Sequence, residues 1–377
     1  MNALKILTAS LLVSVAFSAH AAEDKSHTED SKGNTAYIKT IDSLGDYKTN
    51  MEQQIEQAGT QNHIFIEQNR VNSTNRMYVG LHQVGNKNDF KVNQNGNSQF
   101  ISAYATGDSN TATIGQWGRK AYTKAYTTGN NNKLNIYSGY WGASEETIQV
   151  GKVSVSNYTE VVANGEKNSV LSGINNSNRA IATTFISGKE NTSEIRLNQA
   201  GNSKATINIS GDKNKFKILQ DGSKNEYADN NLRGEITLYR TLAALQTDNT
   251  ASIVQSGTDS SAKITLNGSY NTAAINQDGS YNTASLTQSG TKNNASIYQK
   301  GVSLSGEIYQ SGSGNLAKVS QSGTGNTAKI DQIGNDNSGT ITQNGNNNQA
   351  VIGQYGNKFK TDITQNGSNM KMSIYRQ

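Results

Sequence analysis

The chain has 377 residues, a hydrophobic share of 33%, no proline, no cysteine and a formal net charge of +5. The absence of cysteine excludes disulfide stapling, thiolate catalysis and cysteine-ligated zinc or iron–sulfur sites, and so mild a charge favours a solvated surface over a specific nucleic-acid interface. A low hydrophobic share is typical of disordered or β-aggregating sequences, but a sequence without proline can spend nearly all its length in hydrogen-bonded ladders.

Residues 1–21 have the pattern of an export signal. Lys5 supplies a positive charge, residues 6–17 form an apolar run, and Ala19-His20-Ala21 fits a small-x-small cleavage site. The run is too short to span a membrane, so we expect no membrane span. The mature chain is expected to begin at Ala22.

The next two segments are less regular. Residues 22–42 open on the charged string AEDKSHTEDSKG and are expected to form a flexible leader. Residues 43–251 are interpreted as degenerate repeats, with irregular spacing near residues 188–222 and no clear pattern over residues 229–246. Glycine nevertheless recurs every eleven residues in part of this tract, at Gly85, Gly96, Gly107, Gly118 and Gly129.

Residues 252–377 carry a regular eleven-residue repeat, Gln-x-Gly-x-x-Asn-x-Ala-x-Ile-x, whose last unit is atypical. The glycine, expected in the turn, is found at Gly257, Gly268, Gly279, Gly290, Gly301, Gly312, Gly323, Gly334, Gly345, Gly356 and Gly367. The Gln, replaced once by Leu266, is found at Gln255, Gln277, Gln288, Gln299, Gln310, Gln321, Gln332, Gln343, Gln354 and Gln365. The Asn is found at Asn271, Asn282, Asn293, Asn315, Asn326, Asn337 and Asn348. The aliphatic position, expected in the core, holds Ile264, Ile275, Leu286, Ile297, Ile308, Val319, Ile330, Ile341, Ile352, Ile363 and Ile374.

The fixed period indicates a stacked architecture. A right-handed coiled coil also has an eleven-residue period, but glycine in every unit and one aliphatic residue per unit leave it no seam. In an extended strand, Asn271, Ala273, Ile275 and Gln277 share one face. Seven strand residues and a four-residue turn make one unit, and two facing units make a 22-residue coil. We therefore expect an all-β, cross-β solenoid with two facing parallel sheets.

The interior of this solenoid is expected to combine a thin Ile and Ala core with ladders of Gln and Asn. In each ladder the amide N–H of one residue donates to the amide oxygen of the next residue along the stack. A buried amide without a partner costs about 1–3 kcal/mol, so the ladders have to be continuous. A polar segment can then be repeated because each coil supplies hydrogen-bond partners for the buried amides of the next coil.

The sequence contains no pattern typical of an active site. His27, His63 and His82 share no repeat position, the aspartates form no column, and glycine strings such as Gly312-Ser313-Gly314 lack the strand–helix context of a phosphate loop. Thr-x-Thr columns that would suit ice binding are interrupted by Tyr309 and Asp331. We therefore expect no catalytic residue, no cofactor, no metal and no enzymatic activity.

The repeat resembles the curlin repeat of the curli subunits, the functional amyloid of bacterial biofilm matrix. The resemblance is close over residues 254–375 and looser over residues 83–158, and it extends to a signal peptide with a short charged leader. It implies export through the periplasm, passage through an outer-membrane curli-type secretion pore, and self-assembly with copies of itself and other curlin-like subunits into extracellular, adhesive fibres at the cell surface.

Two departures keep alternatives open. The sequence is long enough for some sixteen coils, whereas familiar curli subunits carry about five repeats. In the last unit Met370, Met372 and Arg376 replace Asn, Ala and Gln, and an arginine cannot join an amide ladder. This unit is interpreted as a cap over an exposed edge, or as the mark of a minor nucleator or anchor subunit. A monomeric solenoid that acts as a surface adhesin is the third interpretation.

Overall fold

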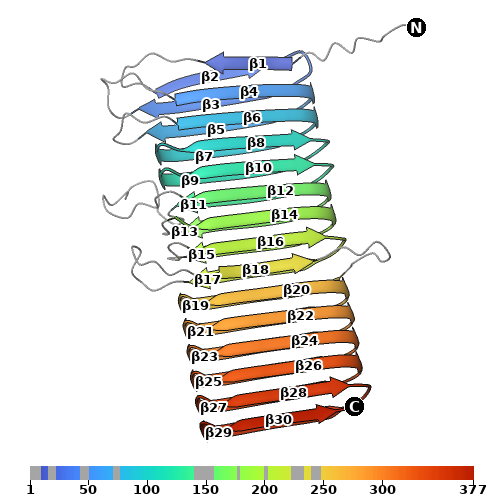
Figure 1. Cartoon of the computed structure of the whole chain (residues 1–377). Helices are drawn as coiled ribbons and strands as arrows, with labels where there is room; N and C mark the ends of the chain where they lie inside the picture. Colours follow the sequence, from blue (N-terminus) through green and yellow to red (C-terminus); the bar gives the residue numbers. More distant parts are fainter. Residues whose placement is uncertain are drawn as a thin grey trace, which may run out of the picture. The chain divides into compact units, whose positions relative to one another are not determined.

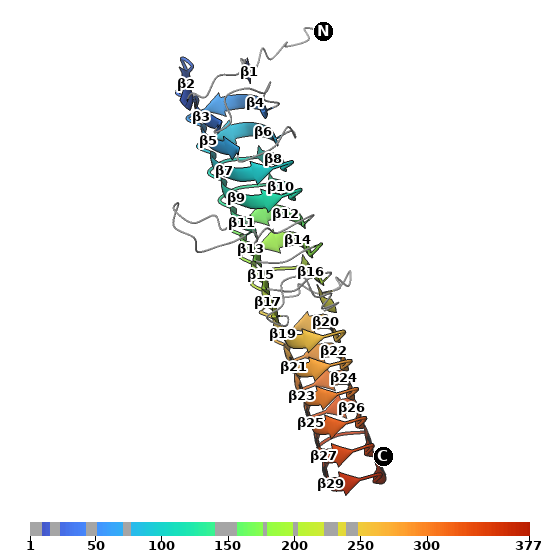
Figure 2. The same ribbon diagram turned by 90° about the vertical axis from the view of Figure 1, so that its left-hand side faces the viewer.

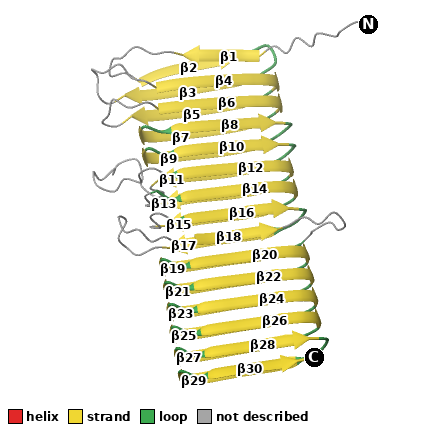
Figure 3. Cartoon of the chain, viewed as in Figure 1, coloured by secondary structure: helices red, strands yellow, loops and turns green. Residues whose placement is uncertain are grey.

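The computed structural model describes residues 10–15, 23–42, 51–70, 77–139, 157–175, 179–198, 203–221, 233–238 and 248–377. These residues contain strands and turns but no helix (Figure 3); accordingly, none of them belongs to a helix that could cross a membrane. The chain divides into two compact units, residues 1–176 and 177–377.

The first unit consists of two sheets whose strands alternate along the chain (Figure 1). One sheet has the order β1-β4-β6-β8-β10-β12 and is here called the even sheet, because all its strands after β1 have even numbers. The other has the order β2-β3-β5-β7-β9-β11-β13 and is here called the odd sheet, because all its strands after β2 have odd numbers. All described pairings are parallel except β1 with β4 and β2 with β3, which are antiparallel. The strands are β1 (Ser10–Val15), β2 (Glu23–Glu29), β3 (Thr35–Asp42), β4 (Met51–Thr60), β5 (His63–Arg70), β6 (Met77–Asn86), β7 (Asp89–Asn97), β8 (Phe100–Thr106), β9 (Thr111–Arg119), β10 (Tyr122–Thr128), β11 (Lys133–Gly139), β12 (Tyr158–Glu166) and β13 (Ser169–Asn175).

The second unit has the same plan and is parallel in all its described pairings. Its even sheet runs from β14 to β30 and its odd sheet from β15 to β29, each in sequence order. The strands are β14 (Ile181–Lys189), β15 (Thr192–Asn198), β16 (Lys204–Ser210), β17 (Lys215–Asp221), β18 (Arg233–Leu238), β19 (Thr250–Thr258), β20 (Ser261–Ser269), β21 (Thr272–Ser280), β22 (Thr283–Thr291), β23 (Asn294–Val302), β24 (Ser305–Ser313), β25 (Leu316–Thr324), β26 (Thr327–Asn335), β27 (Ser338–Asn346), β28 (Gln349–Tyr355), β29 (Lys360–Ser368) and β30 (Lys371–Arg376).

The two sheets of the second unit face each other, with β19 to β29 on one side and β20 to β28 on the other (Figure 2). From β19 onward each strand pairs with the strand 22 residues later, so that Ile275 lies opposite Ile297 and Gln277 opposite Gln299. Side chains alternate between buried and exposed, as an extended strand with one dry face requires. The predicted β-solenoid with two facing parallel sheets is confirmed.

The strands are longer and the turns shorter than the sequence predicted. Pairing runs over nine residues, as in Thr272–Ser280, and continues through Gly279. The corner then needs only Tyr281, which has φ of 59°, and Asn282. Positive φ at both Gly279 and Tyr281 turns the backbone within this short corner, so no four-residue turn is required.

Residues 22–42, expected to be a flexible leader, include the antiparallel pair β2 and β3. In β3, Ala36 and Ile38 are buried, and Asn34-x-Ala36-x-Ile38 follows the repeat pattern. Strand β1 lies within the expected export signal. The expected cleavage site at residues 19–21 and most of the irregular segment 229–246 lie outside the described residues.

Irregular spacing in the degenerate tract still fits the stack. Asn214 follows Asn191 by 23 residues, and its backbone N–H still donates to Asn191 Oδ1. Likewise β14 pairs with β16 in register, with Ile181 opposite Lys204. Strand β17 pairs with β19 at a separation of 35 residues, so that Gln220 lies opposite Gln255. Extra residues therefore enter between strands without a change in the ladder that follows.

Candidate functional site: the polar columns

The Gln side chains of the repeat form two continuous rows, here called the Gln columns, inside the second unit. In the odd sheet, Gln277 Nε2 donates to Gln299 Oε1 at 2.8 Å, and Gln299 Nε2 donates to Gln321 Oε1 at 2.9 Å. The same link joins Gln255 to Gln277, Gln321 to Gln343 and Gln343 to Gln365. In the even sheet it joins Gln288, Gln310, Gln332 and Gln354.

Each of these Gln side chains is fully buried, and a second hydrogen bond crosses the interior to the other sheet. Gln299 Nε2 also donates to the carbonyl oxygen of Thr283 at 3.0 Å, and Gln321 Nε2 to that of Ser305 at 2.9 Å. The amide therefore ties together two neighbouring coils and two facing sheets. Such bonds offset the cost of burying a polar group.

The even column shows what happens when one member is missing. Leu266 occupies the Gln position one coil before Gln288 and is fully buried. Gln288 Oε1 is consequently buried without a hydrogen-bond partner. One interruption leaves one unsatisfied acceptor, and the stack continues on both sides of it.

The Asn side chains line the corners, where they bond to the backbone and, at some positions, also to one another, as Asn315 Nδ2 does to Asn293 Oδ1 at 3.2 Å. Asn271 Oδ1 accepts the backbone N–H of Asn293 at 3.1 Å, and Asn293 Oδ1 accepts that of Asn315 at 3.1 Å. Asn271 Nδ2 donates to the carbonyl oxygen of Gly290, in the facing strand β22, at 3.0 Å. The Asn amide thus satisfies backbone groups at the corresponding corner of the next coil, here Gly290 and Asn293. These rows are here called the Asn columns.

The glycine that accompanies each Asn is required by space and by conformation. Gly301 has φ of 143°, in the region that favours glycine, and a Cβ placed on it would overlap the carbonyl oxygen of Gly323 in the next coil. The carbonyl oxygen of Gly301 accepts a hydrogen bond from Asn282 Nδ2 at 3.0 Å. The repeated glycine thus permits close stacking and supplies the acceptor for the Asn column.

The first unit contains the same columns, of which the Asn column was not assigned from the sequence. Its Asn column runs through Asn34, Asn62, Asn88, Asn110, Asn132 and Asn168, each Oδ1 accepting the next backbone N–H at 3.0–3.1 Å. Among its Gln residues, Gln68 donates to Gln94 at 2.7 Å and Gln94 to Gln116 at 3.1 Å. The spacing of 22 residues, from Asn88 to Asn110 and again to Asn132, was the signal that could have found this column.

Aromatic side chains form a ladder on the outer face of the first unit's even sheet. Phe100 stacks on Tyr78 with ring centroids 4.7 Å apart and on Tyr122 at 4.6 Å, and Tyr122 stacks on Tyr158 at 5.4 Å. Tyr78, Phe100 and Tyr122 stand opposite one another in successive coils, so the register predicts their contact.

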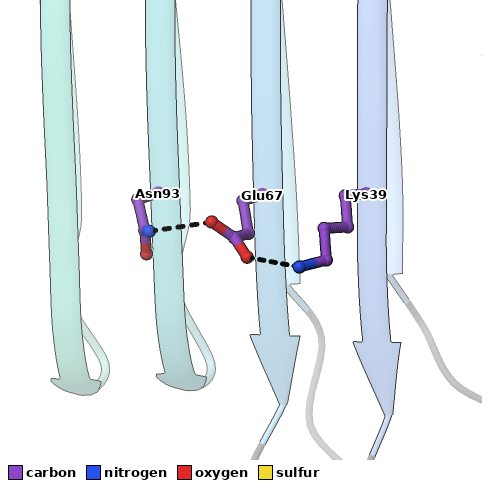
Figure 4. Close-up of polar contacts among 3 residues, drawn as sticks. All are labelled: Lys39, Glu67 and Asn93. Atoms are coloured by element: carbon purple, nitrogen blue, oxygen red, sulfur yellow. Dashed lines mark hydrogen bonds and ion pairs between the residues drawn. The ribbon is translucent and has the colours of Figure 1, made fainter. Parts of the chain in front are cut away.

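Charged side chains on the outer faces pair along the stack in the same way. Glu67 accepts a hydrogen bond from Lys39 Nζ at 3.1 Å and another from Asn93 Nδ2 at 3.4 Å, so three successive strands are linked (Figure 4). In the second unit Lys329 Nζ pairs at 3.1 Å with Glu307, which stands opposite it in the preceding coil. Exposed pairs of this kind contribute little to stability.

Among the described ionisable groups whose pKa is shifted, Tyr158 and Asp30 show two different local causes. Burial raises the pKa of Tyr158 to about 12, helped by the hydrogen bond to Glu160 Oε2 at 2.9 Å and by the charge of that carboxylate. For Asp30 the largest influence is burial, which raises its pKa, but hydrogen bonds from Asn34 and Lys32 outweigh it and hold the pKa below its ordinary value. Asp30 Oδ1 accepts the backbone N–H of Asn34 at 2.9 Å and so ends the Asn column from within the same molecule.

The last coil, residues 359–376, breaks the pattern. Ile374, predicted as core, is only half-buried, since no described strand covers β30 on its outer side, whereas the other predicted core residues are buried. Met370, Met372 and Tyr375 are exposed. Gln354 Nε2, without a Gln in the next coil, donates instead to Thr361 Oγ1 at 3.0 Å, which also accepts from Arg376 Nε at 2.9 Å.

The polar columns hold structure together and offer no reactive group. Amides do not titrate in water, and the described residues contain no group of three or more His, Asp or Glu side chains that could hold a metal ion. What the arrangement can do is join one coil to the next: each internal coil of the regular tract presents strand edges and polar columns that suit another coil of the same kind.

Comparison with known families identifies this repeat. The family model of the curlin associated repeat matches residues 279–305, 303–334 and 334–367. No curated protein sequence matches the chain. All three matches lie in the regular tract whose Gln and Asn columns are described above, and the predicted resemblance to the curlin-repeat family is confirmed for this part of the sequence.

Proposed function

We propose that this protein is a secreted structural subunit of curli-like extracellular fibres, in which copies of the protein, with other curlin-like subunits, assemble by stacking coil on coil. Its C-terminal region consists of curlin repeats, which supports a structural, non-enzymatic role. Such fibres would serve biofilm matrix and surface adhesion, after export through the periplasm and an outer-membrane secretion pore.

One observation carries the proposal: in the second unit's regular tract each internal coil bonds its buried Gln and Asn amides to the next coil, and Gln288 Oε1, after Leu266, is the amide oxygen left without a partner. Gln299 requires the acceptor on Gln321, and Asn293 the backbone donor of Asn315. A surface of this kind is satisfied equally well by a coil of another molecule, because in-register parallel stacking uses the same bonds within and between molecules. Self-assembly follows from the chemistry of the repeat.

The test is assembly of the purified protein from residue 22 onward. We expect fibres with cross-β diffraction spacings of about 4.8 Å along the axis and about 10 Å between sheets, and growth that is accelerated by fragments of preformed fibre. A protein that stays monomeric by light scattering over days would refute the proposal and would favour the monomeric adhesin.

A matched pair of variants tests whether the Gln column drives assembly. The double variant Gln299→Ala and Gln321→Ala removes two adjacent members of one column, whereas Tyr298→Ala removes an exposed outer side chain. We expect the double variant to assemble at least tenfold more slowly and Tyr298→Ala to assemble at the wild-type rate. Equal rates for the two would show that buried amides do not control assembly.

A minor role as nucleator or anchor of such fibres is the second candidate, and the atypical last coil favours it. Substoichiometric amounts of the protein would then shorten the lag of another curlin-repeat protein. The fibre subunit and the nucleator differ in whether the protein also polymerises alone.

A further inference from the structure

We propose that the coil formed by residues 359–376, here called the terminal coil, resists stacking by a second copy and acts as a brake on head-to-tail growth. This inference rests on the proposed function, since it concerns the end at which a second copy would add. The terminal coil differs from the internal coils in the groups that it would present to such a copy.

An internal coil of the regular tract offers its neighbour four polar columns, two of Gln and two of Asn. Leu266 interrupts one Gln column, and Leu304 stands in one Asn column at the corner before β24. Ser260 also stands in an Asn column, but its Oγ still accepts the backbone N–H of Asn282 at 3.2 Å. No described coil from β19 to β28 therefore loses more than one column at a time.

The terminal coil interrupts three of the four columns together. Phe359 and Met370 stand where the two Asn columns continue, and their backbone N–H groups are the last to be accepted, by Asn337 and Asn348 at 3.0 Å. Arg376 stands at the end of the even Gln column. Only Gln365 continues its column, as acceptor from Gln343 at 2.8 Å.

An incoming coil would therefore meet no side-chain acceptor at either corner. Its two corner backbone N–H groups would face Phe359 and Met370, and each buried donor left without a partner is unfavourable. In the even Gln column the incoming coil would cover Arg376, whose guanidinium has five N–H donors and a permanent charge. One amide oxygen cannot satisfy such a group, and burying an unpaired charge is costly.

Steric fit adds a second obstacle. Met372 occupies a row of the even sheet whose earlier members are small: Ala262, Ala284, Gly306, Ala328 and Ala350. Even at Gly306 an added Cβ would lie 2.9 Å from Ile297 Cγ2. Met372 is 43% exposed where it is. A second copy stacked on it would have to bury a long side chain in a layer with room for a methyl group.

The first unit also provides its own termination, at the start of its Asn column. Asp30 supplies the acceptor that Asn34 would otherwise take from a preceding coil, and β2 covers the edge of β3. The backbone N–H of Asn34 is thus already bonded within its own molecule. Phe359, at the corresponding corner of the terminal coil, has no side-chain acceptor. At this corner the Asn34 side therefore has no free backbone donor, and the Phe359 side has no acceptor for one.

The test compares seeded elongation of the protein from residue 22 onward in three forms. The restored variant has Phe359→Asn, Thr361→Ala, Met370→Asn, Met372→Ala and Arg376→Gln, which rebuild the repeat in the last coil. The control variant has Lys360→Thr, Lys371→Thr and Tyr375→Thr, which change exposed outward positions of β29 and β30 only. Elongation from sheared fibres of the same protein is followed by dye fluorescence and by light microscopy of labelled ends.

We expect the restored variant to elongate at least tenfold faster than the wild type, and the control within twofold of the wild type. If the restored variant elongates and the wild type never polymerises, the brake is supported and self-assembly of the natural protein is refuted. Equal rates in all three would overturn the brake and leave the fibre proposal intact. If no form polymerises, both proposals fail. If the circular dichroism spectrum of the restored variant no longer shows β structure, the double variant Phe359→Asn and Met370→Asn is measured instead. We expect it to elongate at least threefold faster than the wild type.

Discussion

At the scale of single residues, the interior of this protein replaces most of an apolar core with amides. Ile and Ala fill one layer of each coil, but the Gln beside them is just as buried. Its burial is favourable only because both of its neighbours in the column are present. The contribution of a Gln at this position to stability therefore depends on the coils before and after it in the column.

This dependence predicts unequal effects for two chemically identical substitutions. Gln321→Leu leaves both Gln299 Nε2 and Gln343 Oε1 without their ladder partner. Gln288→Leu costs less, since Gln288 Oε1 already lacks a partner and no donor of the preceding coil loses its acceptor. Both variants also lose the hydrogen bond to a carbonyl oxygen of the facing sheet, that of Thr272 or of Ser305. With about 1–3 kcal/mol for each buried polar group left unpaired, Gln321→Leu is expected to be the more destabilising by about 1–3 kcal/mol.

Hydrogen exchange measures this difference, because the backbone amides of β23 to β27 report the free energy of opening around Gln321, and those of β20 to β24 report it around Gln288. Leu266 shows that a leucine fits such a position, so steric clash is not the cause of any loss. An equal fall in protection in both variants would contradict a cooperative column.

A second residue-scale prediction concerns alkaline pH. The pKa of Tyr158 is raised to about 12 in the folded protein from an ordinary value of 10.0, so folding favours its protonated form. The contribution of Tyr158 to stability is therefore complete below pH 10 and is lost as the pH rises from about 10 to about 12. Titration of the tyrosinate absorbance should show one late-ionising tyrosine more in the wild type than in Tyr158→Phe. If the tyrosine lost in the variant were one that ionises near pH 10, the prediction would be wrong.

At the scale of strands, the register converts sequence spacing into contact. Two residues at the same position of successive coils in the regular tract lie side by side, whether they are amides, ions such as Lys329 and Glu307, or aliphatic core residues. In the first unit the same rule produces the aromatic ladder over β6, β8, β10 and β12. Outer-face residues thus reinforce the stacking that the inner columns establish.

The aromatic ladder predicts a position-dependent loss. Phe100→Ala removes two ring contacts, with Tyr78 and with Tyr122, whereas Tyr158→Ala removes one. At about 0.5–1.5 kcal/mol for each pair, Phe100→Ala should lower the stability of this unit by about 1–3 kcal/mol beyond the lost burial, and Phe100→Tyr should restore it. Near-ultraviolet circular dichroism and denaturant unfolding measure both effects. If Phe100→Ala were as stable as the wild type, the ring contacts would contribute nothing to the stability of this unit.

The solenoid, the length of its coil and the inward positions of the regular tract could be predicted from the sequence, because a strict repeat makes every coil evidence for the others. The column from Asn34 to Asn168 was missed, since the Gln and Gly positions vary there and only the Asn spacing remains. The corner was also misjudged, because a two-residue turn depends on a backbone conformation of Tyr281 that non-glycine residues rarely adopt.

At the scale of the whole molecule, both compact units are built by the same rule: each coil contacts the coils directly before and after it. Stability in such proteins is close to a sum of coil and interface contributions. Because no interface depends on distant coils, each unit can hold many coils without needing a larger core. The ends are then the positions where chemistry has to change, as Asp30 and the terminal coil do.

A long insertion separates β11 from β12 in the first unit. Asn132 and Asn168 are 36 residues apart in the sequence, yet Asn132 Oδ1 accepts the backbone N–H of Asn168 at 3.0 Å. Asn88 and Asn110, which are only 22 residues apart, make the same bond. The number of residues between β11 and β12 can therefore vary without loss of this bond, so a foreign peptide, an enzyme tag or a metal-capturing loop could be grafted there without redesign of the coils on either side.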